Sequence, residues 1–250
     1  MFDILTILIV AAAFLLAGAV KGVIGLGLPT VSLALLTVAL GLPEAMHLLL
    51  VPSLATNIWQ AVVGGHGPSV LRRTWPFLAM AGATVWLGAG ALTRVDLAFL
   101  SGLLGLLLMV YAGAGLAGRQ FALAPGAERW AGPLAGAANG VLTGMTGSFV
   151  VPGVMYLQAL GLPREALIQA MGMLFTVSTL ALAAALGGNG LLTAELGTLS
   201  AAALLPAIVG MAAGRRIRKT LPERLFRRVF FAALLALGAY IAVAALRGGG

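Results

Sequence analysis

Two glycine-rich segments contain the residues of this chain that are best suited to bind a small charged molecule. The first runs from Lys21 to Thr30 and the second from Asn139 to Ser148. Each interrupts a long apolar stretch, and the glycines in both, with Pro29 in the first, favour the end of one helix and the start of another. Helix N-termini carry unpaired amide groups that attract anions. The two breaks therefore predict an anion site built largely from backbone amides.

Polar side chains in and beside the breaks add hydrogen-bond donors. Lys21 is the cation nearest the first break, and Asn139 takes the equivalent place at the second. A buried lysine is expensive without an anion, so Lys21 is a candidate counter-charge. The full set of candidate binding residues is Lys21, Gly25, Gly27, Thr30, Ser53, Asn57, Asn139, Thr143, Thr146, Gly147 and Ser148.

Each assignment has a plainer alternative. The hydroxyls of Thr143, Thr146 and Ser148 could bond carbonyls of their own helix, which is frequent. Lys21 follows a long apolar helix and could extend to the membrane surface. The helix expected over residues 44–63 places its polar residues 53, 56, 57 and 60 on one face. Such a face, like Gln169, Thr176, Ser178 and Thr179 in the second half, could line a polar cavity or merely join helices.

Composition decides the class of protein. Of 250 residues, 61% are hydrophobic and 9% are charged, whereas a soluble domain carries about 25% charged residues. The apolar runs are continuous, which favours membrane-spanning helices over a barrel. The sequence therefore predicts an all-α integral membrane protein. The chain has no cysteine and two histidines, so we expect no disulfide, metal site or cofactor.

The two halves of the chain resemble each other. Gly41-Leu42-Pro43 and Gly161-Leu162-Pro163 follow the two breaks at matching places. We expect a first repeat over residues 1–117, a polar linker over 118–130 with Arg119, Gln120 and Pro125, and a second repeat over 131–250. Each repeat has about five hydrophobic elements, an odd number, so the second is inverted relative to the first. Inverted repeats are a common architecture of transporters.

Short apolar segments follow both breaks. Residues 28–40 and 148–160 would each cover about 20 Å as helices, less than the hydrocarbon core of about 30 Å. We expect broken, re-entrant half-helices that start at the glycine turns. A short tilted helix is the alternative.

Charge predicts the orientation. The net charge is +8, and cationic residues gather in cytoplasmic loops of membrane proteins. Arg72, Arg73 and the basic run 215–228 are expected inside, and the loop 187–190 outside. Acidic lipid head groups rather than nucleic acid are the expected partners of this charge. Residues 1–20 lack a basic start and are expected to be a retained first helix.

The paired motifs resemble those of the sulfite exporter family, the TauE/SafE-type permeases. The first reads Gly22-x-x-Gly25-x-Gly27, and the second reads Gly140-x-x-x-Gly144-x-x-Gly147-Ser148-Phe149-Val150-Val151-Pro152. The copies differ, because Pro29 follows Gly27 by two residues and Pro152 follows Gly147 by five. The resemblance covers nearly the whole chain. It implies movement of sulfite, sulfonates or related small organic anions across the bacterial inner membrane.

The leading hypothesis is a secondary transporter, an exporter or permease, for small anions, and not an enzyme. No ATP-binding motif is present, and the coupling ion, proton or sodium, is unresolved. A passive anion channel is not separated from a carrier by the sequence. An integral-membrane enzyme would need carboxylates, arginine or a metal site at the breaks, and neither turn contains Asp, Glu, His or Arg. A homo-oligomer is left open.

Overall fold

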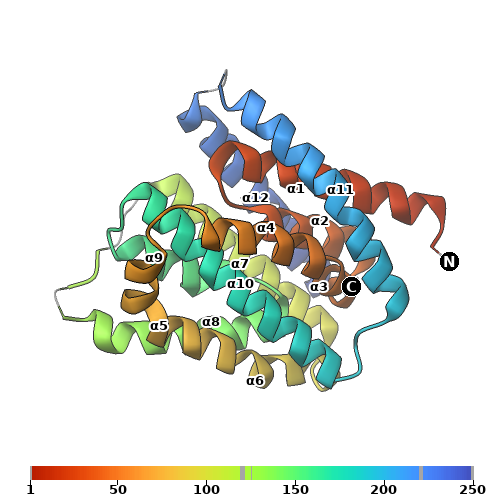
Figure 1. The fold of residues 1–250 in the computed structure, drawn as a ribbon. Helices are drawn as coiled ribbons and strands as arrows, with labels where there is room; N and C mark the ends of the chain where they lie inside the picture. Colours follow the sequence, from red (N-terminus) through yellow and green to blue (C-terminus); the bar gives the residue numbers. More distant parts are fainter. Residues whose placement is uncertain (1, 119–121, 125, 220–221, 249–250) are drawn as a thin grey trace. The chain divides into compact units, whose positions relative to one another are not determined.

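The computed structural model describes residues 2–118, 122–124, 126–219 and 222–248, and the described part of the chain is helical with no strand. Figure 1 shows the arrangement. The helices are α1 (Ile4–Ile24), α2 (Leu28–Leu40), α3 (Leu42–Leu48), α4 (Leu50–Val62), α5 (Gly67–Ala83), α6 (Val85–Ala89), η1 (Gly90–Thr93), α7 (Leu97–Ala117), α8 (Glu128–Thr146), η2 (Val150–Val154), α9 (Met155–Ala159), α10 (Arg164–Gly188), α11 (Ala194–Ile217) and α12 (Glu223–Leu246).

Within the described residues, six helical stretches are long and apolar enough to cross a membrane. They are Ile4–Ile24, Gly67–Thr93, Leu97–Ala117, Arg164–Gly188, Ala194–Ile217 and Arg224–Leu246. The predicted class, an all-α membrane protein, is confirmed. The inverted symmetry of two five-element repeats stays a prediction.

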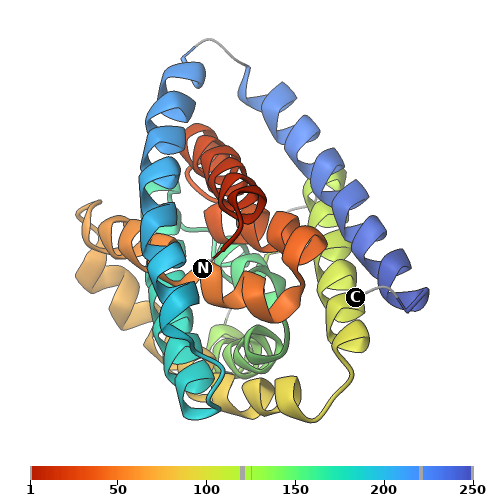
Figure 2. The ribbon, with the colours of Figure 1, turned by 90° about the vertical axis from the view of Figure 1, so that its right-hand side faces the viewer.

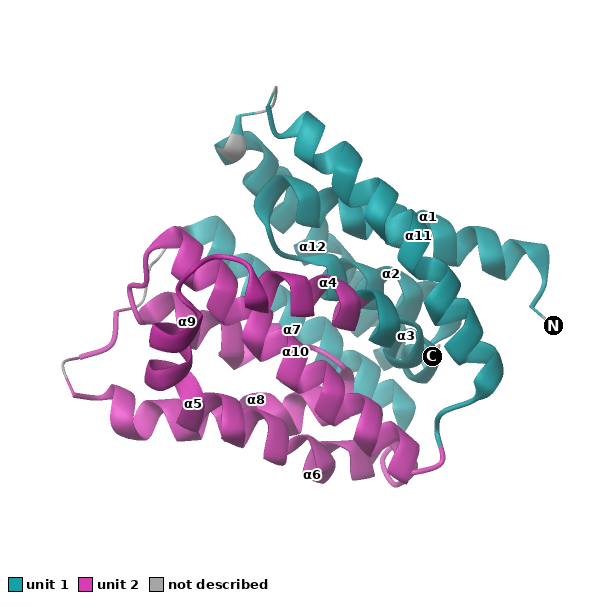
Figure 3. Ribbon diagram, viewed as in Figure 1, with its two compact units in different colours: residues 1–52, 96–117, 191–250 teal, residues 53–95, 118–190 magenta. Residues whose placement is uncertain are grey.

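The chain forms two compact units (Figure 3). Unit 1 comprises Met1–Pro52, Asp96–Ala117 and Leu191–Gly250, and unit 2 comprises Ser53–Val95 and Gly118–Gly190. Each unit takes segments from both sequence halves, so the units are a different division from the predicted repeats. Of the expected linker, Arg119, Gln120 and Pro125 lie outside the described residues. Its last three residues, from Glu128, already belong to α8.

Unit 1 is built on two long helix pairs, α1 with α11 and α7 with α12 (Figure 2). Small residues let the first pair approach closely. A Cβ atom on Gly18 would overlap the carbonyl oxygen of Ala207, and one on Gly214 would overlap that of Ala19. Close backbone contact of this kind replaces the hydrophobic driving force, which is absent between helices in lipid.

We expect Gly214→Leu to destabilise the protein by at least about 1–3 kcal/mol, because the added side chain meets backbone that cannot yield. Gly197→Leu in the same helix is the matched control, since a Cβ atom there meets nothing within 4 Å. Thermal unfolding of the two variants in detergent checks this. Equal melting temperatures would show that the α1–α11 contact is looser than described.

Unit 2 is organised around α8, which packs against α5 and α6, while α10 covers the same two helices. Glycines again face backbone: Cβ atoms on Gly136, Gly140 and Gly144 would overlap carbonyl oxygens or, at Gly140, the Thr84 hydroxyl. The glycine content of the segment before the second break therefore has a packing role. These glycines let the end of α8, just before the break, pack closely against α6.

The helix expected over residues 44–63 is divided in the structure, and the sequence did not predict this division. The division falls at Leu49, between α3 and α4. Proline at position 52 has no amide hydrogen for the carbonyl of Leu48. Ser200 of α11 takes over: its hydroxyl donates to Leu48 O at 2.8 Å and accepts from Val51 N at 3.2 Å. Ser200 thus stabilises the kink.

Both predicted helix breaks are confirmed. In unit 1, α1 ends at Ile24, and Gly25 and Gly27 have φ of 82° and 106° before α2 begins. In unit 2, α8 ends at Thr146 and Gly147 has φ of 72°. These left-handed conformations suit glycine and strain other residues. The sequence therefore located both turns correctly.

The segment after the second break differs from the expected half-helix 148–160. It contains the π-helical turn η2 and the short helix α9, with a non-helical residue, Val151, at φ −119° and ψ 127°. The residue before a proline is disfavoured in the α region, and residue 152 is proline. Residues 147–149 therefore do not form a regular helix N-terminus, and that part of the expectation was wrong.

Candidate functional site

The first break, in unit 1, combines a buried cation with a helix start. Lys21 lies in the last turn of α1 and is 5% exposed, so extension of its side chain to the surface is not what the fold shows. Its carbonyl accepts from Gly25 N at 2.8 Å, which closes α1. Thr30 is also buried. Pro29 lies in the first turn of α2 and has no amide hydrogen, so this helix N-terminus has one hydrogen-bond donor fewer for an anion than a helix start without proline.

Gly27 at this break is also constrained by its neighbours in unit 1. A Cβ atom there would lie 3.1 Å from Val20 Cγ1 and 3.7 Å from the ring of Phe230. Gly27 O accepts from Val31 N at 2.8 Å, which makes Gly27 the N-cap of α2. The turn is therefore fixed both by backbone conformation and by packing.

The second break, in unit 2, is bridged by Asn139. This residue lies on α8, is fully buried, and accepts from Gly153 N at 3.0 Å through Oδ1. A Cβ atom on Gly153 would overlap that same oxygen. The side chain of Asn139 thus replaces the backbone partner that the irregular turn η2 lacks, and it holds η2 beside α8.

The hydroxyls of this break divide into two kinds. Thr146 donates to Leu142 O at 2.7 Å, the plain intrahelical bond. Thr143 donates to Ser148 O at 3.0 Å, which closes the turn from one side to the other. Both hydroxyls are therefore committed to the protein. Thr143 and Thr146 shape the turn. For Thr146 this is the plainer alternative stated above, a bond to a carbonyl of its own helix.

Two donors at the second break are left over. Asn139 Nδ2 and Ser148 Oγ are buried and have no hydrogen-bond partner among the residues that the structure describes. Leaving a buried donor unsatisfied costs about 1–3 kcal/mol. An anion would take hydrogen bonds from both. Of the candidates on this break, these two side chains fit the predicted role best.

Ser178 on α10 adds a third donor of the same kind. It is fully buried, and its hydroxyl has no partner in the described part of the chain. By contrast, Thr176 and Thr179 donate to carbonyls of their own helix, Gly172 O and Phe175 O. Ser178 lies one turn from Leu174, which packs at Gly153 beside Asn139. Burial and missing partners, which spacing does not reveal, separate Ser178 from its neighbours.

The polar face of α4 is buried as its spacing predicted. Ser53 and Asn57 are fully buried, and Ser53 Oγ has no partner in the described chain. Gln60 instead joins helices: it donates to Ile168 O of α10 at 2.7 Å. Gln169 of α10 returns the contact by donating to Ala61 O at 2.8 Å. The two glutamines are helix-joining residues, and Ser53 and Asn57 stay binding candidates.

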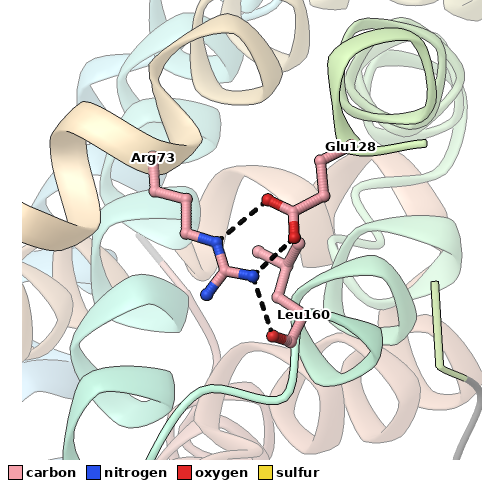
Figure 4. Close-up of polar contacts among 3 residues, drawn as sticks. All are labelled: Arg73, Glu128 and Leu160. Atoms are coloured by element: carbon pink, nitrogen blue, oxygen red, sulfur yellow. Dashed lines mark hydrogen bonds and ion pairs between the residues drawn. The ribbon is translucent and has the colours of Figure 1, made fainter. Parts of the chain in front are cut away.

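An ion pair that the sequence did not single out fixes the end of the second broken segment (Figure 4). Arg73 of α5 forms a two-pronged pair with Glu128 at the start of α8, with Nε donating to Oε2 at 2.9 Å. The same guanidinium donates to Leu160 O at 3.0 Å, just after α9. Arg73 therefore joins three segments that are far apart in sequence, which no spacing rule predicts.

The candidate residues thus divide between the two units. Lys21, Gly25, Gly27 and Thr30 lie at the first break, and Asn139, Thr143, Thr146, Gly147 and Ser148 at the second, with Ser53 and Asn57 on α4. The two breaks lie in different units, so their expected proximity stays a prediction.

Six apolar helices in the described residues, together with breaks that carry buried donors, define a multi-pass membrane protein. The chain matches the model of the family described as sulfite exporter TauE/SafE over residues 10–241, and it belongs to this family. Comparison with curated proteins and with solved structures gives no match. The resemblance of the motifs is confirmed, and membership makes this protein a membrane permease of the sulfite-exporter type.

Proposed function

We propose that the protein is a secondary transporter that exports small sulfur oxyanions, such as sulfite or sulfonates, across the bacterial inner membrane. The observation that carries this proposal is the pair of buried, unsatisfied donors at the second break, Asn139 Nδ2 and Ser148 Oγ. Family membership supports the substrate class. Lys21 is assigned as the counter-charge at the first break.

Neutral donors suit a transported anion. An anion that leaves water loses several kcal/mol of hydration, and hydrogen bonds to a charged group return about 1.5–3 kcal/mol each. Donors without formal charge bind the anion less tightly than several arginines would, so the anion can still be released. Ser178 and Ser53 extend the same chemistry within unit 2. The remaining candidates, Gly25, Gly27, Thr30, Asn57, Thr143, Thr146 and Gly147, set backbone geometry or contact the substrate on its path.

Reconstituted liposomes test the proposal. Uptake of labelled sulfite and of short alkyl sulfonates should saturate with concentration, and an excess of the same anion on the opposite side should accelerate it. Sulfate and carboxylates serve as comparison substrates. Linear uptake without exchange would indicate a passive channel. Flux of carboxylates alone would overturn the sulfur oxyanion assignment.

The orientation can be checked cleanly because the chain has no native cysteine. We expect Asn189→Cys, in an exposed turn after α10, to react with an impermeant maleimide from outside the cell. Lys219→Cys, just after α11, should react only after the cytoplasmic side is opened. The excess of arginine and lysine at the cytoplasmic ends predicts this result. The reverse pattern of labelling would overturn the orientation.

A further inference from the structure

A pocket in unit 1 lies apart from both breaks. It has a volume of about 370 Å³ and lies where α2 ends, next to the first turns of α7 and the last turns of α12. The lining residues are Thr37, Val38, Ala39, Leu40, Gly41, Ser101, Tyr240, Ile241 and Ala244. The ends of three helices meet at this pocket.

The hydroxyl of Thr37 gives the pocket a buried polar group that a bound molecule could meet. Thr37 is 8% exposed, and its Oγ1 has no hydrogen-bond partner in the described chain. The buried hydroxyl of Ser32 on the same helix bonds the carbonyl four residues earlier, Leu28 O, at 2.8 Å. Thr37 lacks that bond and lines the pocket instead. An unsatisfied polar group of this kind is costly unless a ligand meets it.

The electrostatics of the pocket favour a cation. The C-terminus of α2 carries partial negative charge, and the carbonyl of Ala39 has no amide four residues later, because residue 43 is proline. Glu44 does not itself line the pocket, but its carboxylate lies beside Gly41, which does: Oε2 is 3.2 Å from where a Cβ atom on Gly41 would be. Among the described residues that line the pocket none is basic.

The shape and lining favour an amphiphile over a bare ion. The pocket would hold roughly a dozen water molecules, and a dehydrated metal ion needs its oxygen ligands at about 2–2.6 Å. Val38 and Tyr240 are exposed at the rim, and Ile241 and Ala244 give an apolar wall. Arg247 lies one helical turn beyond Ala244 and is exposed, where it suits a phosphate at the surface.

We propose that this pocket binds the head group of a phospholipid that ends in a primary ammonium, as in phosphatidylethanolamine. The ammonium donates to Thr37 Oγ1 and to the carbonyl end of α2, with the Glu44 carboxylate as counter-charge. The phosphate lies toward Arg247, and an acyl chain follows the apolar wall of α12. This site is independent of the transport reaction and of its substrate.

Native mass spectrometry of the delipidated protein tests the site with dioctanoyl phosphatidylethanolamine as the probe. Thr37→Val keeps the shape of the side chain and removes the hydroxyl, so we expect about tenfold weaker binding, the size of one lost hydrogen bond to a charged group. Glu44→Gln should weaken binding similarly. Ser32→Ala, which removes a hydroxyl that already has a partner on α2, should bind as the parent does.

Competing ligands distinguish the possible occupants. Dioctanoyl phosphatidylglycerol, free ethanolamine and sodium chloride should each fail to displace the probe at matched concentration. Equal binding of phosphatidylglycerol would overturn ammonium recognition, and displacement by ethanolamine or sodium would show a free-cation site. If Ala244→Phe, which fills the pocket, and Thr37→Val both bind the probe as the parent does, the proposal fails.

Discussion

Gly147→Val is expected to abolish anion uptake while the protein still reaches the membrane. Gly147 has φ of 72° at the end of α8, a conformation that costs a non-glycine residue about 1–2 kcal/mol and a β-branched one more. Its amide donates to Thr143 O at 2.7 Å, and the hydroxyl of the next residue, Ser148, has no partner among the described residues. A shift of this turn would displace Ser148, whose carbonyl accepts from the Thr143 hydroxyl at 3.0 Å. Uptake into liposomes, normalised to the amount of reconstituted protein, measures the effect.

Gly27→Val should act in the same way at the first break, where φ is 106° and Val20 is close. Gly190→Val is the matched control: φ there is 70°, and a Cβ atom meets nothing within 4 Å. It carries a similar backbone strain away from both breaks, so uptake should persist. If both break variants transport as well as Gly190→Val, the breaks are not part of the substrate path.

Lys21→Met is expected to weaken anion binding by roughly 10- to 100-fold, because one hydrogen bond from a charged group contributes about 1.5–3 kcal/mol. Lys21 is 5% exposed, and methionine fills a similar volume without a charge. Binding should therefore fall, and the melting temperature shows whether the variant is still folded. Calorimetric titration with sulfite and thermal unfolding together measure both quantities.

Arg94→Ala provides the comparison for Lys21, because Arg94 is an exposed cation outside the breaks. It should leave affinity unchanged at physiological salt, where exposed charges are screened beyond about 8 Å. Lys21→Arg keeps the charge and should retain part of the binding. A Lys21→Met protein that binds sulfite like the parent would rule out the counter-charge role, and it would leave the Asn139 and Ser148 donors untouched.

The sequence predicted both breaks because a helix break depends mainly on the residues at the break itself. Positive φ at Gly25, Gly27 and Gly147 needs glycine, and the apolar length around each turn shows that the interruption falls within a membrane segment. The same reasoning missed the irregular start of η2. The apolar residues of this segment favour a helix, but Pro152 disfavours the helical conformation at the residue before it, Val151.

The sequence by itself determined the membrane class, the helical content and the two turns, because hydrophobicity, segment length and glycine are read residue by residue. Only the tertiary structure decided which donors are free. Thr146 and Ser148 look alike in sequence, yet one hydroxyl bonds Leu142 O and the other has no partner in the described chain. Likewise, Ser200 meets Leu48, and Arg73 meets Glu128 and Leu160, through packing between distant segments. Whether a buried donor has a partner depends on such spatial neighbours, and the order of residues along the chain does not show which distant residues become neighbours.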